Sequence, residues 1–522
     1  MSRSRFAVSL SLSLSLSLSL ALGACGGNDA PPPVAPRSSP IASVTPPAPP
    51  VDALGSRPPL PPPPPFVPPV PVTYTRPNGM TVWLLERHAL PIVSIQVVVP
   101  AGAATDPEGK GGLALAAANM LDEGAGTRGA LDISRDVDRL GATLSTGAYA
   151  DYAFAAITTL KKNLAPASAI LGDVVVKPTF SAVEWKRVHD LWLNELRARA
   201  SEPDAVAGVV SLRQLYGNDP YGHPTNGTLK SAARVTLEDV KRFYGAAWRP
   251  NHATVVVAGD VTRAELDPLL DQVLGAWKAP RADATAEAKA KADAPVKASA
   301  SANASASANA AMKAGRRVVV VDRPDAPQSV LALVRDGVAG DDADAPALVR
   351  INTALGGSFT SRLNQDLREE HGWSYGARSR FSFNKRKGLF SAQAAVHTEH
   401  TGEALKAMIA DVEAIAREGL TDEEVEKTRL IARGELVDAF ESVEAAARRL
   451  ARNAGVSLPA DHEAKAATAL DRATKDDLRK LAAMHLDPKN AIIVIVGPRA
   501  KLQPQLEKIG ITAVETSGPE GD

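Results

Sequence analysis

The chain is short of cysteine, of aromatic residues and of net charge. Its single cysteine among 522 residues excludes an intramolecular disulfide and any cysteine-cluster zinc or iron–sulfur site. Aromatic residues make up only 4%, so aromatic cages or base-stacking platforms are not expected to dominate. The 59 basic residues equal the 59 acidic residues, which argues against a polybasic nucleic-acid binder and against an acidic disordered protein. We therefore expect no nucleic-acid partner.

The remaining composition is that of a globular protein, apart from an excess of proline at one end. Hydrophobic residues make up 45% and charged residues 23%, and the length is too great for one core. Of the 40 prolines, 19 fall between Pro31 and Pro71. Composition thus predicts an unfolded front section followed by several conventional domains.

The first residues have the pattern of a secretory signal. Arg3 and Arg5 precede an uncharged run at 6–24, much of which alternates serine with leucine. Half of the alternating stretch 9–20 is serine, so a permanent membrane span is the less favoured alternative. We expect residues 1–24 to be a signal peptide.

The only cysteine, Cys25, directly follows this signal. The segment resembles a bacterial lipoprotein signal, in which cleavage precedes a cysteine that then carries lipid; a plain signal peptide with a chance cysteine is the alternative. Several acyl chains on Cys25 would anchor the protein stably to a membrane. Gly26 in place of aspartate favours the outer membrane by analogy with bacterial sorting. The resemblance implies a lipid-anchored, periplasm-facing protein of the bacterial cell envelope.

Two segments without large apolar residues divide the rest of the chain. The Pro-rich segment 25–71 is expected to be a disordered, stiff tether. The segment 281–314 contains 16 alanines in 34 residues and is expected to be a linker. Two bodies remain, at 72–280 and 315–516.

The two bodies contain a related stretch of sequence. Residues 236–259 align without a gap with residues 474–497, at a constant offset of 238. In each, an acidic helix start leads to an amphipathic helix, a proline ends it, and a β-branched run follows. The offset far exceeds a solenoid repeat, so we expect a duplicated domain.

Hydrophobic periodicity predicts mixed helices and strands in both bodies. In the first body we expect strands at 81–86 and 92–99, a helix at 112–123 and a hairpin at 142–160. In the second body we expect strands at 317–321 and 329–334, helices at 346–355 and 362–370, and a hairpin at 374–396. Hairpins mixed with helices predict an α+β fold with two homologous domains, each with helices packed on a largely antiparallel sheet.

Short motifs in a fixed order carry a family resemblance. They are Gly112-Leu113-Ala114, Met120-Leu121, Tyr221-Gly222-His223-Pro224, Gly356-Gly357-Ser358, Ser361-Arg362-Leu363, Leu367-Arg368-Glu369 and Ser374-Tyr375. In order and spacing, the chain resembles the pitrilysin/insulinase family of inverted zinc peptidases, which includes mitochondrial processing peptidase and the core subunits of cytochrome bc1. The resemblance covers nearly all of both bodies.

The metal motif of that family is absent from the aligned helix. Active members carry H-x-x-E-H, whose residues share one helical face, so that two imidazoles bind zinc while glutamate activates the bound water. Here the positions hold Leu115, Ala118 and Asn119. The family's third ligand, 76 residues after the second histidine, falls on Glu195. A residual metal contact and a helix-surface or buried carboxylate remain its two interpretations.

No other part of the sequence replaces this metal site. The close pair His397 and His400 flanks Glu399, but a solvated loop is the favoured interpretation. We expect no metal cofactor in this chain and no catalysis by the chain alone.

A second feature of the family is retained. Members use an arginine and a tyrosine seven residues apart, matched here by Arg368 and Tyr375. The resemblance implies that Tyr375 donates to the oxyanion of the tetrahedral intermediate and that Arg368 positions the substrate backbone. The alternatives are a helix-surface salt bridge of Arg368 with Glu369 or Asp366, and a Tyr375 packed at a strand start.

Loss of one motif with retention of the other implies a division of labour. We expect a non-catalytic, substrate-binding subunit of a heterodimeric zinc peptidase that acts on peptides or unfolded proteins, with zinc in a paralogous partner. The alternative is a structural or assembly protein of the same fold, like the core subunits of respiratory complexes. The sequence leaves heterodimer and homodimer open.

Overall fold

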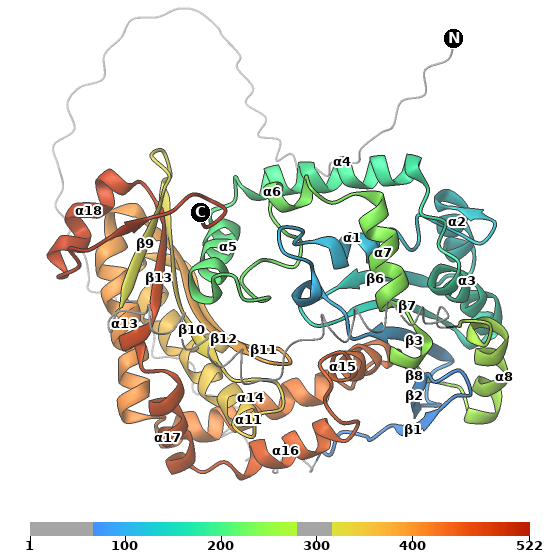
Figure 1. The fold of residues 1–522 in the computed structure, drawn as a ribbon. Coiled ribbons are helices and arrows are strands. Elements are labelled where there is room, and N and C mark those ends of the chain that lie inside the picture. The colour runs from blue at the N-terminus through green and yellow to red at the C-terminus, as the bar shows by residue number, and fades with distance from the viewer. Residues whose placement is uncertain (1–65, 279–315) are drawn as a thin grey trace, which may run out of the picture. The chain divides into compact units, whose positions relative to one another are not determined.

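The computed structural model describes residues 66–278 and 316–522. The predicted signal peptide and Cys25 lie outside the described residues. So do the tether up to residue 65 and the whole of the linker 281–314. Within them, two six-stranded sheets are covered by helices (Figure 1).

The first sheet has the order β1-β2-β8-β3-β7-β6, and only β2 and β8 run parallel. Its strands are β1 (Val72–Thr75), β2 (Thr81–Glu86), β3 (Ile92–Val99), β6 (Thr143–Ala148), β7 (Ala153–Leu160) and β8 (Thr254–Gly259). The β-branched runs of β3 and β8 are buried on both faces, so both strands lie in the middle of the sheet.

The second sheet has the order β11-β12-β10-β13-β9-β14. Its strands are β9 (Arg317–Asp322), β10 (Gln328–Gly337), β11 (Ser374–Phe383), β12 (Gly388–His397), β13 (Ile492–Gly497) and β14 (Glu515–Thr516). Five strands repeat the order of the first sheet, with β9 in the place of β2 and β11 in the place of β6. The predicted α+β class with two homologous, largely antiparallel sheets is confirmed.

The predicted repeat corresponds to the same element pair in both halves. Helix α7 (Leu237–Ala247) leads into β8, and helix α17 (Lys475–His485) leads into β13, at the predicted offset. Each helix begins with a capping box, in which Thr236 and Thr474 exchange hydrogen bonds with an aspartate three residues later.

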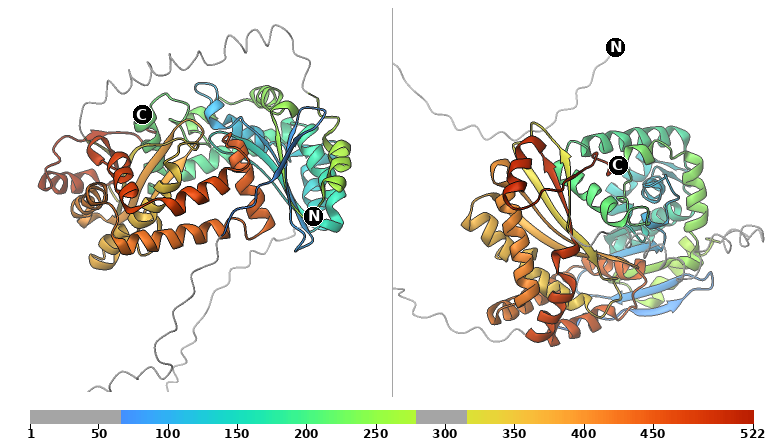
Figure 2. Two further views of the ribbon diagram at one scale, coloured as in Figure 1. Left: turned by 90° about the horizontal axis from the view of Figure 1, so that it is seen from below. Right: turned by 60° about the vertical axis from the view of Figure 1, so that its left-hand side comes forward.

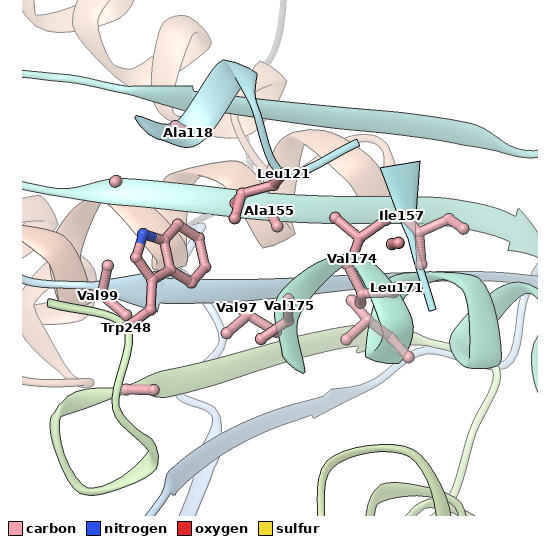
Figure 3. Packing of buried hydrophobic residues seen from close by; sticks show 14 of the residues in the cluster. Val97, Val99, Ala118, Leu121, Ala155, Ile157, Leu171, Val174, Val175 and Trp248 are labelled. Atoms are coloured by element: carbon pink, nitrogen blue, oxygen red, sulfur yellow. The ribbon is translucent and has the colours of Figure 1, made fainter. Parts of the chain in front are cut away.

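One face of each sheet carries the helices of its own half. In the first half, α1 (Leu113–Asn119), α3 (Leu164–Val176) and α8 (Arg263–Leu274) bury a core with strands β3, β7 and β8 (Figure 3). In the second half, α11 (Ala345–Asn352), α13 (Thr401–Glu418), α17 and α18 (Arg499–Lys508) take this place (Figure 2).

The other face of each sheet is covered by a helix from the opposite half. Helix α15 (Val443–Gly455) packs on β3 and β8 of the first sheet, and Leu450 in it is fully buried. Helix α5 (Pro203–Tyr216) packs on β10 and β13 of the second sheet through Val206 and Val210. This reciprocal exchange of helices gives each half part of the other's core.

The tip of the β11–β12 hairpin also docks on the first half. The backbone N–H of Lys385 donates to Asp151 Oδ2 at 2.8 Å, and Lys387 Nζ donates to Asp219 Oδ2 at 2.7 Å. The two halves are therefore joined by polar contacts as well as by exchanged helices.

The remaining helices complete the described part of the chain. They are α2 (Ala130–Arg139), α4 (Ala182–Arg199), α6 (Leu229–Ala232), α12 (Arg362–Asn364), α14 (Asp422–Asp438) and α16 (His462–Arg472). Among the helices in residues 66–278 and 316–522, none has both the length and the apolar character needed to span a bilayer.

Three expected elements differ from their predictions. The helix expected at 112–123 ends at Asn119. The helices expected at 346–355 and 362–370 each change into a π-helix, η4 (Thr353–Gly357) and η5 (Gln365–Glu370). Short π-helical stretches are rare and frequently lie at functional sites.

Candidate functional site

Helix α1, which would carry the metal motif, is anchored at its first turn. The carboxylate of Asp106 accepts the N–H groups of Gly112 at 2.7 Å and Ala114 at 2.8 Å. Gly112 has φ of 99° and lies so close to Trp192 that a Cβ would come within 2.4 Å of its ring. Burial raises the pKa of Asp106 to about 7, although the N–H groups of the helix start oppose the shift.

A cavity of about 350 Å³ lies beside this helix, between α1 and α4. Leu115 and Asn119, one turn apart on α1, line it together with Glu195 from α4. The structure therefore brings together three positions that lie up to 80 residues apart in the sequence. Leu191 and Trp192 contribute apolar surface to the same cavity.

The side chains present do not fit a catalytic zinc ion. Leu115 offers no donor atom, and Ala118 is fully buried in the first core, where it is labelled in Figure 3. The neighbouring Glu123 is engaged in an ion pair with Arg187. No group of three or more histidine, cysteine or carboxylate side chains in the described ranges is arranged to hold a metal ion. Glu195 alone retains the position of a ligand.

Arg368 and Tyr375 line a second cavity, of about 410 Å³. Tyr375 is 83% exposed, and in the part of the chain that the structure describes no residue hydrogen-bonds its hydroxyl. Asp204, at the start of the exchanged helix α5, lines the same cavity, so both halves contribute to it. The hydroxyl is free to meet a ligand from outside this chain.

Arg368 has partners on its own chain. Its guanidinium lies over the ring of Phe359, 4.6 Å from the centroid, and its Nε lies 3.4 Å from Glu369 Oε1. The salt bridge to Glu369, one of the two alternatives for Arg368, is thus present. An exposed pair of this kind is worth at most about 1 kcal/mol, so Arg368 can exchange it for a ligand at low cost.

A β-bulge orients Tyr375. Pairing of β11 with β12 is irregular between Ser374 and Ala377, which leaves Tyr375 and Gly376 unpaired. The Ser374 hydroxyl donates to the Ala395 carbonyl at 2.7 Å and accepts the N–H of Gly376 at 3.0 Å, which stabilises the bulge. A bulge commonly redirects a side chain at a functional site, and this one places Tyr375 at the cavity. The sequence pattern did not indicate it.

The π-helix η5 places Arg368 in the same cavity. Asn364, the last residue before it, accepts the N–H of Ala377 through Oδ1 at 2.8 Å and so ties the helix to the bulged strand. Asp366 of this helix interacts electrostatically with Asp411 of α13. Burial, and then the repulsion of Asp366, raise the pKa of Asp411 to about 7. Sequence reasoning missed this acidic pair because its members are 45 residues apart.

The histidines His397 and His400 do not form a metal site with Glu399. The ring of His397 packs edge-on against Tyr375 at 6.2 Å, and the ring of His400 stacks on Trp373 at 5.6 Å. His400 Nδ1 also lies 3.1 Å from Glu403. The solvated loop expected at 397–400 is not present. Strand β12 ends at His397, and a 3-10 helix, η6 (Thr398–His400), follows with Thr398 buried.

The two domains share one sheet-and-helix topology, which is a peptidase-like fold. Helix α1 lacks the side chains that would bind a metal, and a cavity in the second domain carries Arg368 and Tyr375. Residues 81–229 match the family model described as "Insulinase (Peptidase family M16)", and residues 234–431 match the model described as "Peptidase M16 inactive domain". The chain belongs to the insulinase family, peptidase family M16.

Curated relatives agree with this family. An uncharacterized zinc protease of Mycobacterium leprae is 24% identical over 435 residues, which cover 82% of this chain and 91% of the relative. A non-peptidase homolog of Helicobacter pylori is 22% identical over 347 residues, which cover 66% of this chain and 74% of the relative.

Solved structures share the fold. The peptidase M16 inactive domain from Pseudomonas fluorescens superimposes with a TM-score of 0.71 at 24% identity, covering 82% of this chain and 98% of the other. A chain of complex III2 from Candida albicans gives 0.66 at 11% identity, covering 85% of this chain and 99% of the other.

Proposed function

We propose that this chain is the non-catalytic, substrate-binding subunit of a heterodimeric zinc metallopeptidase that acts on peptides or unfolded proteins. The observation that carries the proposal is the exposed Tyr375, held by a bulge beside Arg368 in a cavity, in a chain whose metal positions are Leu115 and Asn119. Zinc and its general base would come from a paralogous partner.

The chemistry of the cavity suits this role. Peptide hydrolysis passes through an oxyanion. The Tyr375 hydroxyl has no hydrogen-bond partner among residues 66–278 and 316–522, so it can donate to that oxyanion without first breaking a bond to one of them. The guanidinium of Arg368 presents several N–H donors to peptide carbonyl groups. Its contacts with Phe359 and Glu369 hold it at the cavity without burying it.

For the location, we propose a lipid anchor at Cys25 and a periplasm-facing position at the bacterial outer membrane. The sequence of the signal, the cysteine and the Pro-rich segment supports it. Radiolabelled palmitate should label the wild-type chain and not a Cys25→Ala variant.

A structural or assembly role is the second candidate. The non-peptidase homolog of Helicobacter pylori is similar to this chain in sequence, and the chain of complex III2 from Candida albicans is similar to it in fold. In this chain, the salt bridge of Arg368 with Glu369 favours the structural role, because it accounts for Arg368 without any contact to a substrate.

Reconstitution with a zinc-bearing paralogue tests the proposal. The mature chain alone should hold no stoichiometric zinc and cleave no peptide, and the mixture with a paralogue that carries H-x-x-E-H should cleave a fluorogenic peptide. In the mixture, Tyr375→Phe should lower kcat tenfold or more, because one donor to the transition state is lost, while the size-exclusion profile of the complex stays the same.

Tyr74→Phe is the matched control. It removes a hydroxyl that bonds Asp267 at 2.7 Å, away from the cavity, and should leave turnover unchanged. If Tyr375→Phe cleaves as fast as the wild type, the role of Tyr375 is wrong. A stable complex that is indifferent to both Arg368 and Tyr375 would support the structural role instead.

A further inference from the structure

A cavity of about 690 Å³ lies on the face of the first sheet that points away from α1. Its floor is formed by the polar residues Gln96, Thr143, Ser145 and Thr158. Successive side chains of a strand point to opposite faces, and the alternate residues Thr146 and Ile157 belong to the α1 side. This cavity is therefore separate from both cavities of the candidate functional site.

Three aromatic rings form one wall. Tyr149 lies 4.9 Å from Tyr152 and 5.9 Å from Phe154 between ring centroids, and it is 54% exposed. The position of Tyr152 is fixed by Gly455 at the end of α15, where a Cβ would lie 2.3 Å from its ring. The exposed ring of Tyr149 offers an apolar face that a second ring can stack on.

Three arginines of α15 also line the cavity, and two of them have carboxylate partners. Arg448 Nη1 lies 3.2 Å from Glu444, and Arg449 binds the buried Glu463 through two hydrogen bonds of 2.7 and 3.0 Å. Neither is available as an uncompensated charge.

Arg452 differs from its neighbours. It donates to the carbonyl of Phe383 at 3.1 Å, and no described carboxylate lies within ion-pair distance of it. The other carboxylate of the cavity, Asp151, accepts hydrogen bonds from the Tyr221 hydroxyl at 2.5 Å and from the backbone of Lys385. Burial lowers the pKa of the Arg452 guanidinium, but an arginine remains charged in a protein.

We propose that this cavity binds a small aromatic carboxylate, with its ring on Tyr149 and Phe154 and its carboxylate on Arg452. A planar carboxylate matches the fork of a guanidinium, and the cavity has the volume of a small-molecule site. A single unpaired arginine, with Glu444 at the same cavity, suits one negative charge rather than several.

The ligand would act on both halves of the molecule. The aromatic residues of the cavity belong to the first half, and Arg452 belongs to the second. Binding would therefore stabilise the docked arrangement of the halves and raise the melting temperature.

The test uses 3-phenylpropionate and its uncharged analogue 3-phenylpropionamide with the mature full-length protein. Ligand-observed NMR titration should show saturable binding of the carboxylate at least tenfold tighter than that of the amide. Arg452→Gln should abolish this preference, and Arg452→Lys should retain part of it. The control Arg417→Gln, at an exposed position of α13 that does not line the cavity, should retain it fully.

Equal affinity for carboxylate and amide, or no saturable binding of either, would overturn the proposal. An unchanged preference in a folded Arg452→Gln protein would do so as well. A circular dichroism spectrum of each variant shows whether it is folded, and Arg452→Lys keeps the test decisive if Arg452→Gln unfolds. The peptidase reconstitution does not involve this cavity, so the two proposals fail independently.

Discussion

Leu115, Ala118 and Asn119 lie on one helix, but the structure gives them different surroundings. Leu115 and Asn119 face a cavity, whereas Ala118 packs in the core. The helical spacing predicted that all three share one face, and the structure places only Leu115 and Asn119 at the cavity. The burial of Ala118 depends on strands that are distant in the sequence, so it required the structure.

Asp411 shows how a single buried charge affects stability. Burial and repulsion by Asp366 and Glu370 raise its pKa from 3.8 to about 7, and only Arg362 opposes them. The neutral form is favoured in the folded protein. The stability that this group contributes is therefore full below its ordinary pKa and is lost as the pH rises to about 7.

Asp411→Asn should accordingly stabilise the protein at pH 8 and have little effect near pH 4. The amide removes the cost of ionising a half-buried carboxyl group, which we expect to be on the order of 1 kcal/mol. Urea unfolding at both pH values measures it. Glu423→Gln, at an exposed position of α14, should change neither value, and a gain at pH 4 equal to that at pH 8 would contradict the assignment.

At the scale of elements, local pattern predicted most helices and strands but missed their irregularities. Strands β2 and β3 begin and end where the alternation predicts. The π-helix η5 and the bulge at Ser374 were expected as regular helix and strand, because both depend on tertiary bonds, such as that of Asn364 with Ala377. These irregular segments carry Arg368 and Tyr375, so the sequence predicted the residues of the site but not how they are held.

The exchange of α5 and α15 also escaped prediction, since an amphipathic helix does not encode which sheet it covers. Leu450→Ala in α15 should cost about 3 kcal/mol of unfolding free energy, because Leu450 is fully buried against the sheet of the other half. Chemical denaturation measures the loss.

Leu430→Ala in α14 provides the comparison. Leu430 is 41% exposed, and its truncation should cost less than about 1 kcal/mol. Equal effects of the two substitutions would mean that α15 contributes little to the core of the first half.

At the scale of the whole molecule, the repeat predicted from the sequence corresponds to two sheets with five strands in the same order. The constant offset revealed it because α7–β8 and α17–β13 contain no insertion. The boundaries predicted for the two bodies stay a prediction. They follow composition, whereas the packing of α5 and α15 crosses between the bodies.

A chain divided between the halves tests this packing. Fragments 66–296 and 297–522, expressed together with a tag on one, should copurify, because each contains a helix that the other's sheet needs. Each fragment alone should aggregate, since one apolar sheet face would be exposed. Two fragments that are separately soluble and monomeric would contradict the role of the exchanged helices.

The exchange also limits how far the chain can be shortened. Helix α5 supplies Val206 and Val210 to the core of the second sheet and Asp204 to the cavity of Arg368 and Tyr375. A chain shortened to the second half would therefore lose part of the core of its own sheet and one residue of that cavity. The first half is thus needed for the structure of the second, whether or not it takes part in any chemistry itself.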